Sequence, residues 1–201
     1  MCFDKNTQLT IGSKMRNLLN SLFLLTLIMV LQSCAAPGNN PAEKRNSVDK
    51  MATSVLQDLY KIKPDVRTQI RDAAGYAVFS NANVNIIFFS ASGGYGVVRD
   101  NKTSHKTYMK MAEAGLGLGL GVKDFRAVFV FHDAKTLNRF IEKGWQFGGH
   151  ADAAAKAGEK GASVAGEMVV DNISIYQITE SGLALQLTIK GTKYWKDEGL
   201  N

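Results

Sequence analysis

Short apolar runs separated by glycine or polar residues follow one another from Gly75 to Gly191. Closely spaced runs of this kind are typical of strands in an antiparallel sheet. The last two runs meet at Glu180-Ser181-Gly182 and predict a terminal hairpin, and an aromatic pair, Tyr194-Trp195, follows it. The predicted strands are GYAVFS (75–80), VNIIFFSAS (84–92), GYGVVRD (94–100), KTYMKMAEAGLGLGLGV (106–122), FRAVFVF (125–131), EMVVDNISIYQIT (167–179) and LALQLTIKG (183–191).

Apolar residues with helical spacing precede these strands and interrupt them once. Helices in front, one helix in the middle and a majority of strands predict an α+β fold. We expect N-terminal helices followed by a twisted antiparallel β-sheet or sandwich with one inserted helix. The predicted helices are 48–61 with Ser47 as N-cap, about 65–74 ending at Gly75, and 134–143 between the N-cap Asp133 and the terminating Gly144.

A long apolar run near the start of the chain has the pattern of a secretory signal peptide. Lys14 and Arg16 form its basic beginning, and the apolar region runs from Leu18 to Leu31. The ending Leu-Gln-Ser-Cys resembles a bacterial lipobox, in which the cysteine receives acyl chains such as palmitate. We therefore expect residues 1–33 to be a signal peptide and Cys34 to be lipidated.

Two other interpretations of this segment stay open, namely an uncleaved membrane anchor and ordinary cleavage without lipidation. The apolar run is shorter than the ~20 residues that a spanning helix prefers, which favours the lipoprotein. Met15 is an alternative start, and residues 1–14 would then be an extension. Residues 34–46 carry two of the three prolines and predict a flexible tether, and residues 47–201 predict a single domain.

Charge and cysteine content narrow the function classes. Removing residues 1–33 lowers the formal net charge from +6 to +4. This charge suits an anionic surface such as lipid headgroups and is too small for a nucleic-acid binder. The two cysteines, Cys2 and Cys34, lie before the predicted domain, which excludes disulfides and thiolate metal sites inside it.

Four alternating glycines form the most unusual stretch after the leader: Gly115, Gly117, Gly119 and Gly121. On one strand they leave one face bare, which permits close approach of another surface. The Gly/Ala-rich segment 148–166 is one partner for that face, and a bound acyl chain is the alternative. The spacing does not fit a dinucleotide-binding loop.

Two sets of basic residues are candidates for binding lipid headgroups. Lys102, Lys106 and Lys110 share one face of the predicted strand with Tyr108, and Arg67 and Arg71 stand one helical turn apart. The alternative for both sets is a solvated outer face, on which lysines also discourage edge-to-edge pairing of strands.

Residues for catalysis are sparse in this sequence. His105, His132 and His150 show no metal-ligand spacing, and no Gly-x-Ser-x-Gly motif occurs. We therefore expect neither an enzyme nor a bound cofactor or metal.

Residues 75–195 resemble a SYLF domain, a lipid-binding module of bacterial lipoproteins and of eukaryotic actin- and phosphoinositide-associated proteins. The similarity covers about four-fifths of the chain behind Cys34 when the two leading helices are counted. It implies lipid binding through the domain. The matching segments are AGYAVF (74–79), GGYGVV (93–98), AGLGLGLGVKDFRAVFVF (114–131), the helix ending in Phe140, GGHADA (148–153), Ile175-Tyr176 and Ser181-Gly182-Leu183.

Together these features predict a membrane-anchored, non-enzymatic lipid-binding lipoprotein of the bacterial envelope. Ala35 after the cysteine favours the periplasmic side of the outer membrane in a Gram-negative cell. The expected partners are membrane phospholipid and envelope proteins. Nucleic acid and actin are not expected. The alternative is a structural or protein-interaction module of the envelope without lipid binding of its own.

Overall fold

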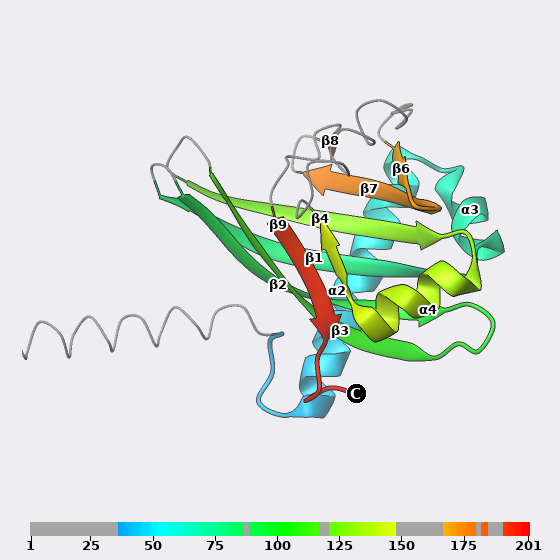
Figure 1. Ribbon diagram of the computed structural model, residues 1–201, viewed down its shortest axis with the longest axis horizontal. Helices are drawn as coiled ribbons and strands as arrows, with labels where there is room; N and C mark the ends of the chain where they lie inside the picture. Colours follow the sequence, from blue (N-terminus) through cyan, green and yellow to red (C-terminus); the bar gives the residue numbers. More distant parts are fainter. Residues whose placement is uncertain (1–35, 87–88, 117–120, 148–166, 180–181, 185–190) are drawn as a thin grey trace, which may run out of the picture. The chain divides into compact units, whose positions relative to one another are not determined.

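Figure 1 shows the computed structural model of the chain, which describes residues 36–86, 89–116, 121–147, 167–179, 182–184 and 191–201. Within these residues one antiparallel sheet and three helices confirm the α+β fold class. The elements are α2 (Pro41–Ile62), α3 (Val66–Asp72), β1 (Gly75–Ile86), β2 (Phe89–Asp100), β3 (Lys106–Leu116), β4 (Gly121–Phe131), α4 (Ala134–Lys143), β5 (Trp145–Phe147), β6 (Glu167–Val170), β7 (Ile173–Thr179), β8 (Gly182–Ala184) and β9 (Gly191–Lys196).

The strand order is β5-β9-β3-β2-β1-β4-β7-β6, and β8 pairs with β7 beyond the end of β6. The neighbours β3-β2-β1-β4 have the Greek-key order, because β4 returns to pair with β1 rather than with β3. The strand β9 enters the sheet between β3 and β5.

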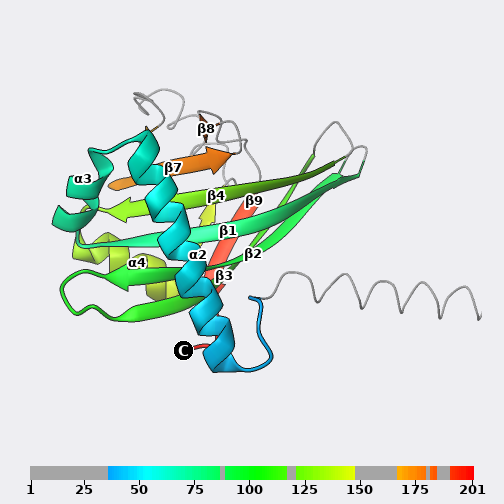
Figure 2. The same cartoon turned by 180° about the vertical axis from the view of Figure 1, so that it is seen from behind.

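Helix α2 lies across one face of the sheet, over β1, β2 and β4 (Figure 2). Side chains alternate across each strand, so every second residue meets this helix. These strand residues, together with α2 and α3, form the outer cluster. Its buried members include Val48, Ala52, Val55, Leu59, Val66, Ile70, Val78, Val97, Tyr108, Val128, Val130, Tyr176, Ile178 and Leu200.

Helix α4 covers the opposite face (Figure 1) and packs on the intervening residues of the same strands. Together they form the inner cluster, whose buried members are Ala77, Phe79, Val98, Met109, Met111, Ala127, Phe129, Phe131, Leu137, Phe140, Ile173, Ile175 and Tyr194. The rings of Phe129 in β4 and Tyr194 in β9 lie 5.3 Å apart, although β3, β2 and β1 separate these two strands in the sheet. The sheet therefore curls around α4.

The first helix begins at Pro41 rather than at Val48, so the predicted tether is wrong for residues 41–46. The Asn40 side chain accepts a hydrogen bond from the Glu43 N–H at 2.9 Å and donates one to the Glu43 carboxylate at 2.7 Å. The first of these bonds is an N-cap, and the Glu43 carboxylate also accepts a hydrogen bond from the Asn39 backbone N–H at 2.8 Å. Pro41 at the first helical position fits the same start. The third predicted helix, with its N-cap Asp133, is confirmed.

Three predicted strands, 75–80, 84–92 and 94–100, are in fact the two long strands β1 and β2. Polar Asn81 was expected to end a strand, but its buried side chain donates to the hydroxyl of Ser92 at 3.0 Å. Gly94 was expected to break the chain, but it lies inside β2, where an added Cβ would come within 2.3 Å of the Ser80 carbonyl oxygen.

The predicted strand 106–122 is divided between β3 and β4, and the predicted strand 167–179 is itself a hairpin. Asp171 and Asn172 form its turn with positive φ values of 50° and 64°. A two-residue turn with two positive φ values matches the twist of a hairpin, and Asp and Asn tolerate that conformation.

Candidate ligand-binding site

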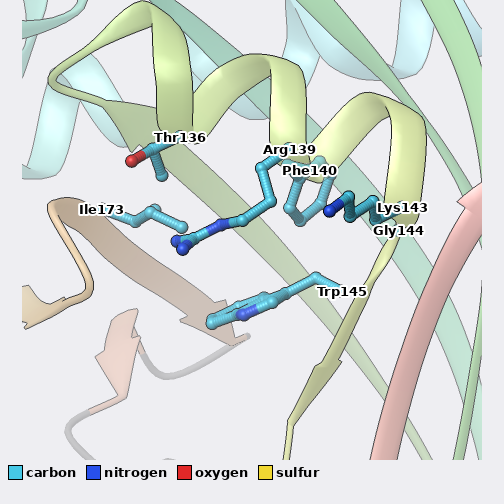
Figure 3. A pocket seen from close by; sticks show the side chains of 7 residues that line it. All are labelled: Thr136, Arg139, Phe140, Lys143, Gly144, Trp145 and Ile173. Carbon is cyan, nitrogen blue, oxygen red and sulfur yellow. The ribbon is translucent and has the colours of Figure 1, made fainter.

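A cavity of about 160 Å³ lies beside α4 and is called here the α4 pocket. Figure 3 shows the side chains that line it, which come from α4, the start of β5 and the start of β7. The lining residues are Thr136, Arg139, Phe140, Lys143, Gly144, Trp145 and Ile173.

The end of α4 positions the wall of the pocket. Gly144 has a φ of +66°, and a Cβ there would lie 2.2 Å from the Tyr194 carbonyl oxygen, so glycine is required. The chain passes at once into β5, and Trp145 pairs with Tyr194 in β9. This turn directs the indole of Trp145 to the pocket side of the helix (Figure 3).

The floor of the pocket is apolar. Phe140 and Ile173 are 2% and 1% exposed. The half-buried Trp145 ring lies 6.1 Å from the Phe140 ring and 5.8 Å from the Phe129 ring. Contacts on both sides restrict these rings, so the floor is fixed by the inner cluster before any ligand arrives.

Two cations stand at the mouth of the pocket. Arg139 and Lys143 are exposed and one helical turn apart, and Lys135 lies one turn earlier on the same helix. Figure 3 shows the Arg139 side chain extending across the mouth between Ile173 and Trp145. None of the three makes a salt bridge to any residue in the described ranges.

A polar clasp closes the far end of the pocket. The carboxylate of Asp133 accepts hydrogen bonds from the Thr136 N–H at 2.7 Å, from the Thr136 hydroxyl at 3.0 Å and from the Asn172 side chain. These bonds favour the charged form and lower the pKa of Asp133 to about 2, with the Asn172 bond as the largest cause. The clasp joins α4 to the turn between β6 and β7.

The predicted lysine set is only partly on one strand face. Lys106, Tyr108 and Lys110 share the face of β3 that meets α2, but Lys102 lies in the turn before β3. Lys106 and Lys110 form salt bridges with Asp49 and Asp197 at 2.8 and 3.1 Å.

Tyr108 is buried, with 8% of its surface exposed, and its hydroxyl donates to the Asp49 carboxylate at 3.3 Å. Burial raises the pKa of Tyr108, and the charge of Asp49 adds to the effect. The Tyr108 side chain therefore links β3 to α2.

The predicted arginines lie exposed on α3. The Arg67 guanidinium carbon is 4.4 Å from the centre of the Tyr60 ring, a cation–π contact, and Arg71 pairs with Asp72 at 2.8 Å. Asn101, in the turn that carries Lys102, donates to the carbonyl of Ile70 at 2.6 Å. The turn therefore lies against α3, which brings Lys102 to the same end of the sheet as Arg67 and Arg71, whereas Lys106 and Lys110 lie along β3.

The predicted glycine strand does not exist as one strand. Gly115 lies in β3 and pairs with Ser90, whereas Gly121 begins β4 and pairs with Asn85. Because β2 and β1 separate β3 from β4, these two glycines do not share a strand face. Gly117, Gly119 and the proposed partner segment 148–166 lie outside the described residues.

A histidine–serine pair was missed in the sequence because its members are 42 positions apart. The His132 Nε2 atom lies 2.8 Å from the Ser174 hydroxyl oxygen, which also accepts a bond from Gln69 at 3.2 Å. Ser174 is fully buried, so a substrate does not reach its hydroxyl. The pair therefore joins the residue after β4 to β7, the Gln69 bond adds α3, and the hydroxyl is not placed to act as a nucleophile.

Across the described ranges, no three His, Cys, Asp or Glu side chains gather as a metal site would require. Nor is any helix there both long enough and apolar enough to span a bilayer.

The fold and the pocket define a class of protein: an α+β domain with a curled antiparallel sheet between helices and an amphipathic pocket beside one helix. Residues 112–201 match the Ysc84 family model, described as Las17-binding protein actin regulator. The chain is 34% identical over 158 residues to beta cell expansion factor A of Aeromonas veronii. That alignment covers 79% of this chain and 59% of that protein, so the chain spans about three-fifths of its length. The chain belongs to the SYLF-domain family, as its sequence motifs predicted.

Proposed function

We propose that this protein is a non-enzymatic lipid-binding lipoprotein held at a bacterial envelope membrane by Cys34, and that the α4 pocket is its lipid site. The observation that carries the proposal is the position of Arg139 and Lys143 over an apolar floor. Membership of the SYLF family supports a lipid-binding or protein-interaction module at the family level.

An anionic amphiphile matches both halves of the site. Its head gains from two cations that have no competing acidic partner in the described part of the chain. Its apolar part gains from contact with Phe140, Trp145 and Ile173. An indole beside exposed cations also suits the interface between headgroups and acyl chains.

Vesicle co-sedimentation of residues 36–201 tests the proposal, since this segment contains the whole described core. We expect binding to vesicles that contain phosphatidylglycerol and none to phosphatidylcholine alone. Binding should weaken as salt rises from about 0.1 M to about 1 M, because salt screens the headgroup charge.

Two sets of substitutions locate the site. Arg139→Gln with Lys143→Gln should reduce vesicle binding more than Lys102→Gln with Lys106→Gln and Lys110→Gln, because Lys106 and Lys110 are already paired with carboxylates. A larger loss from the lysine set would move the site to β3. No binding by the unaltered domain at low salt would reject lipid binding and leave the protein-interaction module.

A further inference from the structure

We infer that the α4 pocket selects an amphiphile with one alkyl chain and an oxyanion head, with only about the first six carbons of the chain inside. This inference rests on the proposed lipid-binding function and names the ligand class of that site. The head would lie at Arg139 and Lys143, and the chain would lie on the floor formed by Phe140, Trp145 and Ile173.

The volume of the α4 pocket limits how many carbons of an alkyl chain fit inside it. Its volume is about 160 Å³. A dry protein cavity of about 150 Å³ holds one benzene molecule, which has six carbons. Drug-sized ligands need about 300–1,000 Å³. Two acyl chains therefore do not enter, and a longer single chain extends beyond the pocket after about six carbons.

The floor is poor in hydrogen-bond donors, because the indole N–H of Trp145 is the single donor among its three side chains. Thr136 is the one hydroxyl among the lining residues, and it donates to the Asp133 carboxylate at 3.0 Å. Phe140 and Ile173 have no polar atoms in their side chains. A polar or branched headgroup inside the pocket would lose several bonds to water, and one indole N–H could replace few of them, so the chain enters and the head stays outside.

The charge at the mouth comes from side chains and not from the helix. Arg139 and Lys143 lie in the last turns of α4, where the backbone carbonyls carry partial negative charge. Glu142 is also exposed on this helix. Without the two cations this region would repel an anion, so binding depends strongly on them. Arg139 presents a planar set of donors that matches a phosphate or carboxylate.

The fluorescence of Trp145 can report ligand binding directly, because this residue lines the pocket and the protein has only two tryptophans. In residues 36–201 carrying Trp195→Phe, indole emission reports Trp145 alone. We would titrate this protein with butyl, hexyl, octyl and dodecyl phosphate, each below its micelle concentration. Hexanol, inorganic phosphate and dihexanoyl phosphatidylglycerol, which has two chains, are the comparison ligands.

We expect saturable binding whose affinity rises about fourfold for each methylene from butyl to hexyl phosphate and then levels off. Hexanol and inorganic phosphate should each bind at least about tenfold more weakly than hexyl phosphate, because hexanol lacks the oxyanion and inorganic phosphate lacks the alkyl chain. Arg139→Gln should weaken hexyl phosphate binding about tenfold, whereas Lys50→Gln, an exposed cation on α2, should leave it unchanged.

Several results would overturn the inference. They are equal binding of inorganic phosphate or hexanol, an affinity that keeps rising past octyl phosphate, tighter binding of the two-chain lipid, or no effect of Arg139→Gln. The vesicle assay separates this failure from that of the proposed function. Vesicle binding without a Trp145 response to hexyl phosphate rejects the single-chain inference alone, whereas the absence of both rejects the two together.

Discussion

At the scale of single residues, the inner cluster depends on how closely aromatic rings approach the backbone of the sheet. The Phe79 ring lies 4.7 Å from the Tyr194 ring and 5.7 Å from the Phe129 ring, and it passes over Gly96 on the neighbouring strand. A Cβ at Gly96 would stand 2.3 Å from the Phe79 ring and 2.4 Å from the Val78 carbonyl oxygen. Neither neighbour has room to move inside a packed core.

Gly96→Ala should therefore lower the free energy of unfolding by about 1–3 kcal/mol, as overpacking does. Urea denaturation of residues 36–201 measures the change. Gly199→Ala is the matched control, because its Cβ would meet only the Asp197 carboxylate at an ordinary 3.4 Å. Equal stability of the Gly96 variant and the unaltered domain would show that the ring is not held as described.

Asp133 gives a pH-dependent prediction at the same scale. Its pKa falls from an ordinary 3.8 to about 2 in the folded protein, so its stabilisation is complete above pH 3.8 and disappears as pH falls through 2. Asp133→Ala should lower the melting temperature at pH 7 and make little difference near pH 2.

Thermal melts at pH 7, 4 and 2 compare this variant with Glu142→Ala, which removes an exposed carboxylate of α4 that is not its cap. The Glu142 variant should show no comparable loss at pH 7. A difference for Asp133→Ala that persists unchanged at pH 2 would contradict the assigned role of the carboxylate.

At the scale of elements, α2 is held to the sheet by one buried row, Val48, Ala52, Val55 and Leu59. Leu59 is fully buried, whereas Leu56 on the same helix is half-buried. Leu59→Ala should lower the free energy of unfolding by about 2–5 kcal/mol, and Leu56→Ala by clearly less. Urea midpoints compare the two variants, and a reversed order would mean that α2 presents a different face to β1.

Local patterns predicted the elements better than they predicted the ends of the elements. Asp133 and Gly144 marked α4 correctly, because a cap and a terminating glycine act within a few residues. The N-cap bond between Asn40 and Glu43 was just as local, but Ser47 offered a competing start. Asn81 was misjudged because its partner Ser92 lies on the next strand, and only the pairing of β1 with β2 makes it an interior residue.

The site was less predictable than the fold for the same reason. The spacing of Lys135, Arg139 and Lys143 was visible in the sequence, as was Trp145 after Gly144. What turns them into a pocket is Ile173, which β7 brings to α4 from a distant part of the chain. Likewise, the salt bridges of Lys106 and Lys110 depend on α2 and the chain end, which strand alternation does not reveal.

At the scale of the whole molecule, the predicted acyl anchor changes how much affinity the α4 pocket needs. A tether at Cys34 keeps the domain at high effective concentration near the bilayer, so a weak pocket is sufficient. Cys34→Ala should release the protein from the membrane fraction and abolish incorporation of labelled palmitate. Arg139→Gln is the control and should leave both unchanged. Palmitate incorporation into the Cys34 variant would place the acyl group elsewhere.

The position of β9 also sets the order in which the molecule assembles. Its two neighbours, β3 and β5, leave the ribosome earlier, yet both keep an unpaired edge until residues 191–196 arrive. The inner cluster likewise waits for the ring of Tyr194. Contacts of such long range make sheet completion slow and late. A chain that still lacks residues 191–196 therefore has an open sheet edge at β3 and an inner cluster without Tyr194.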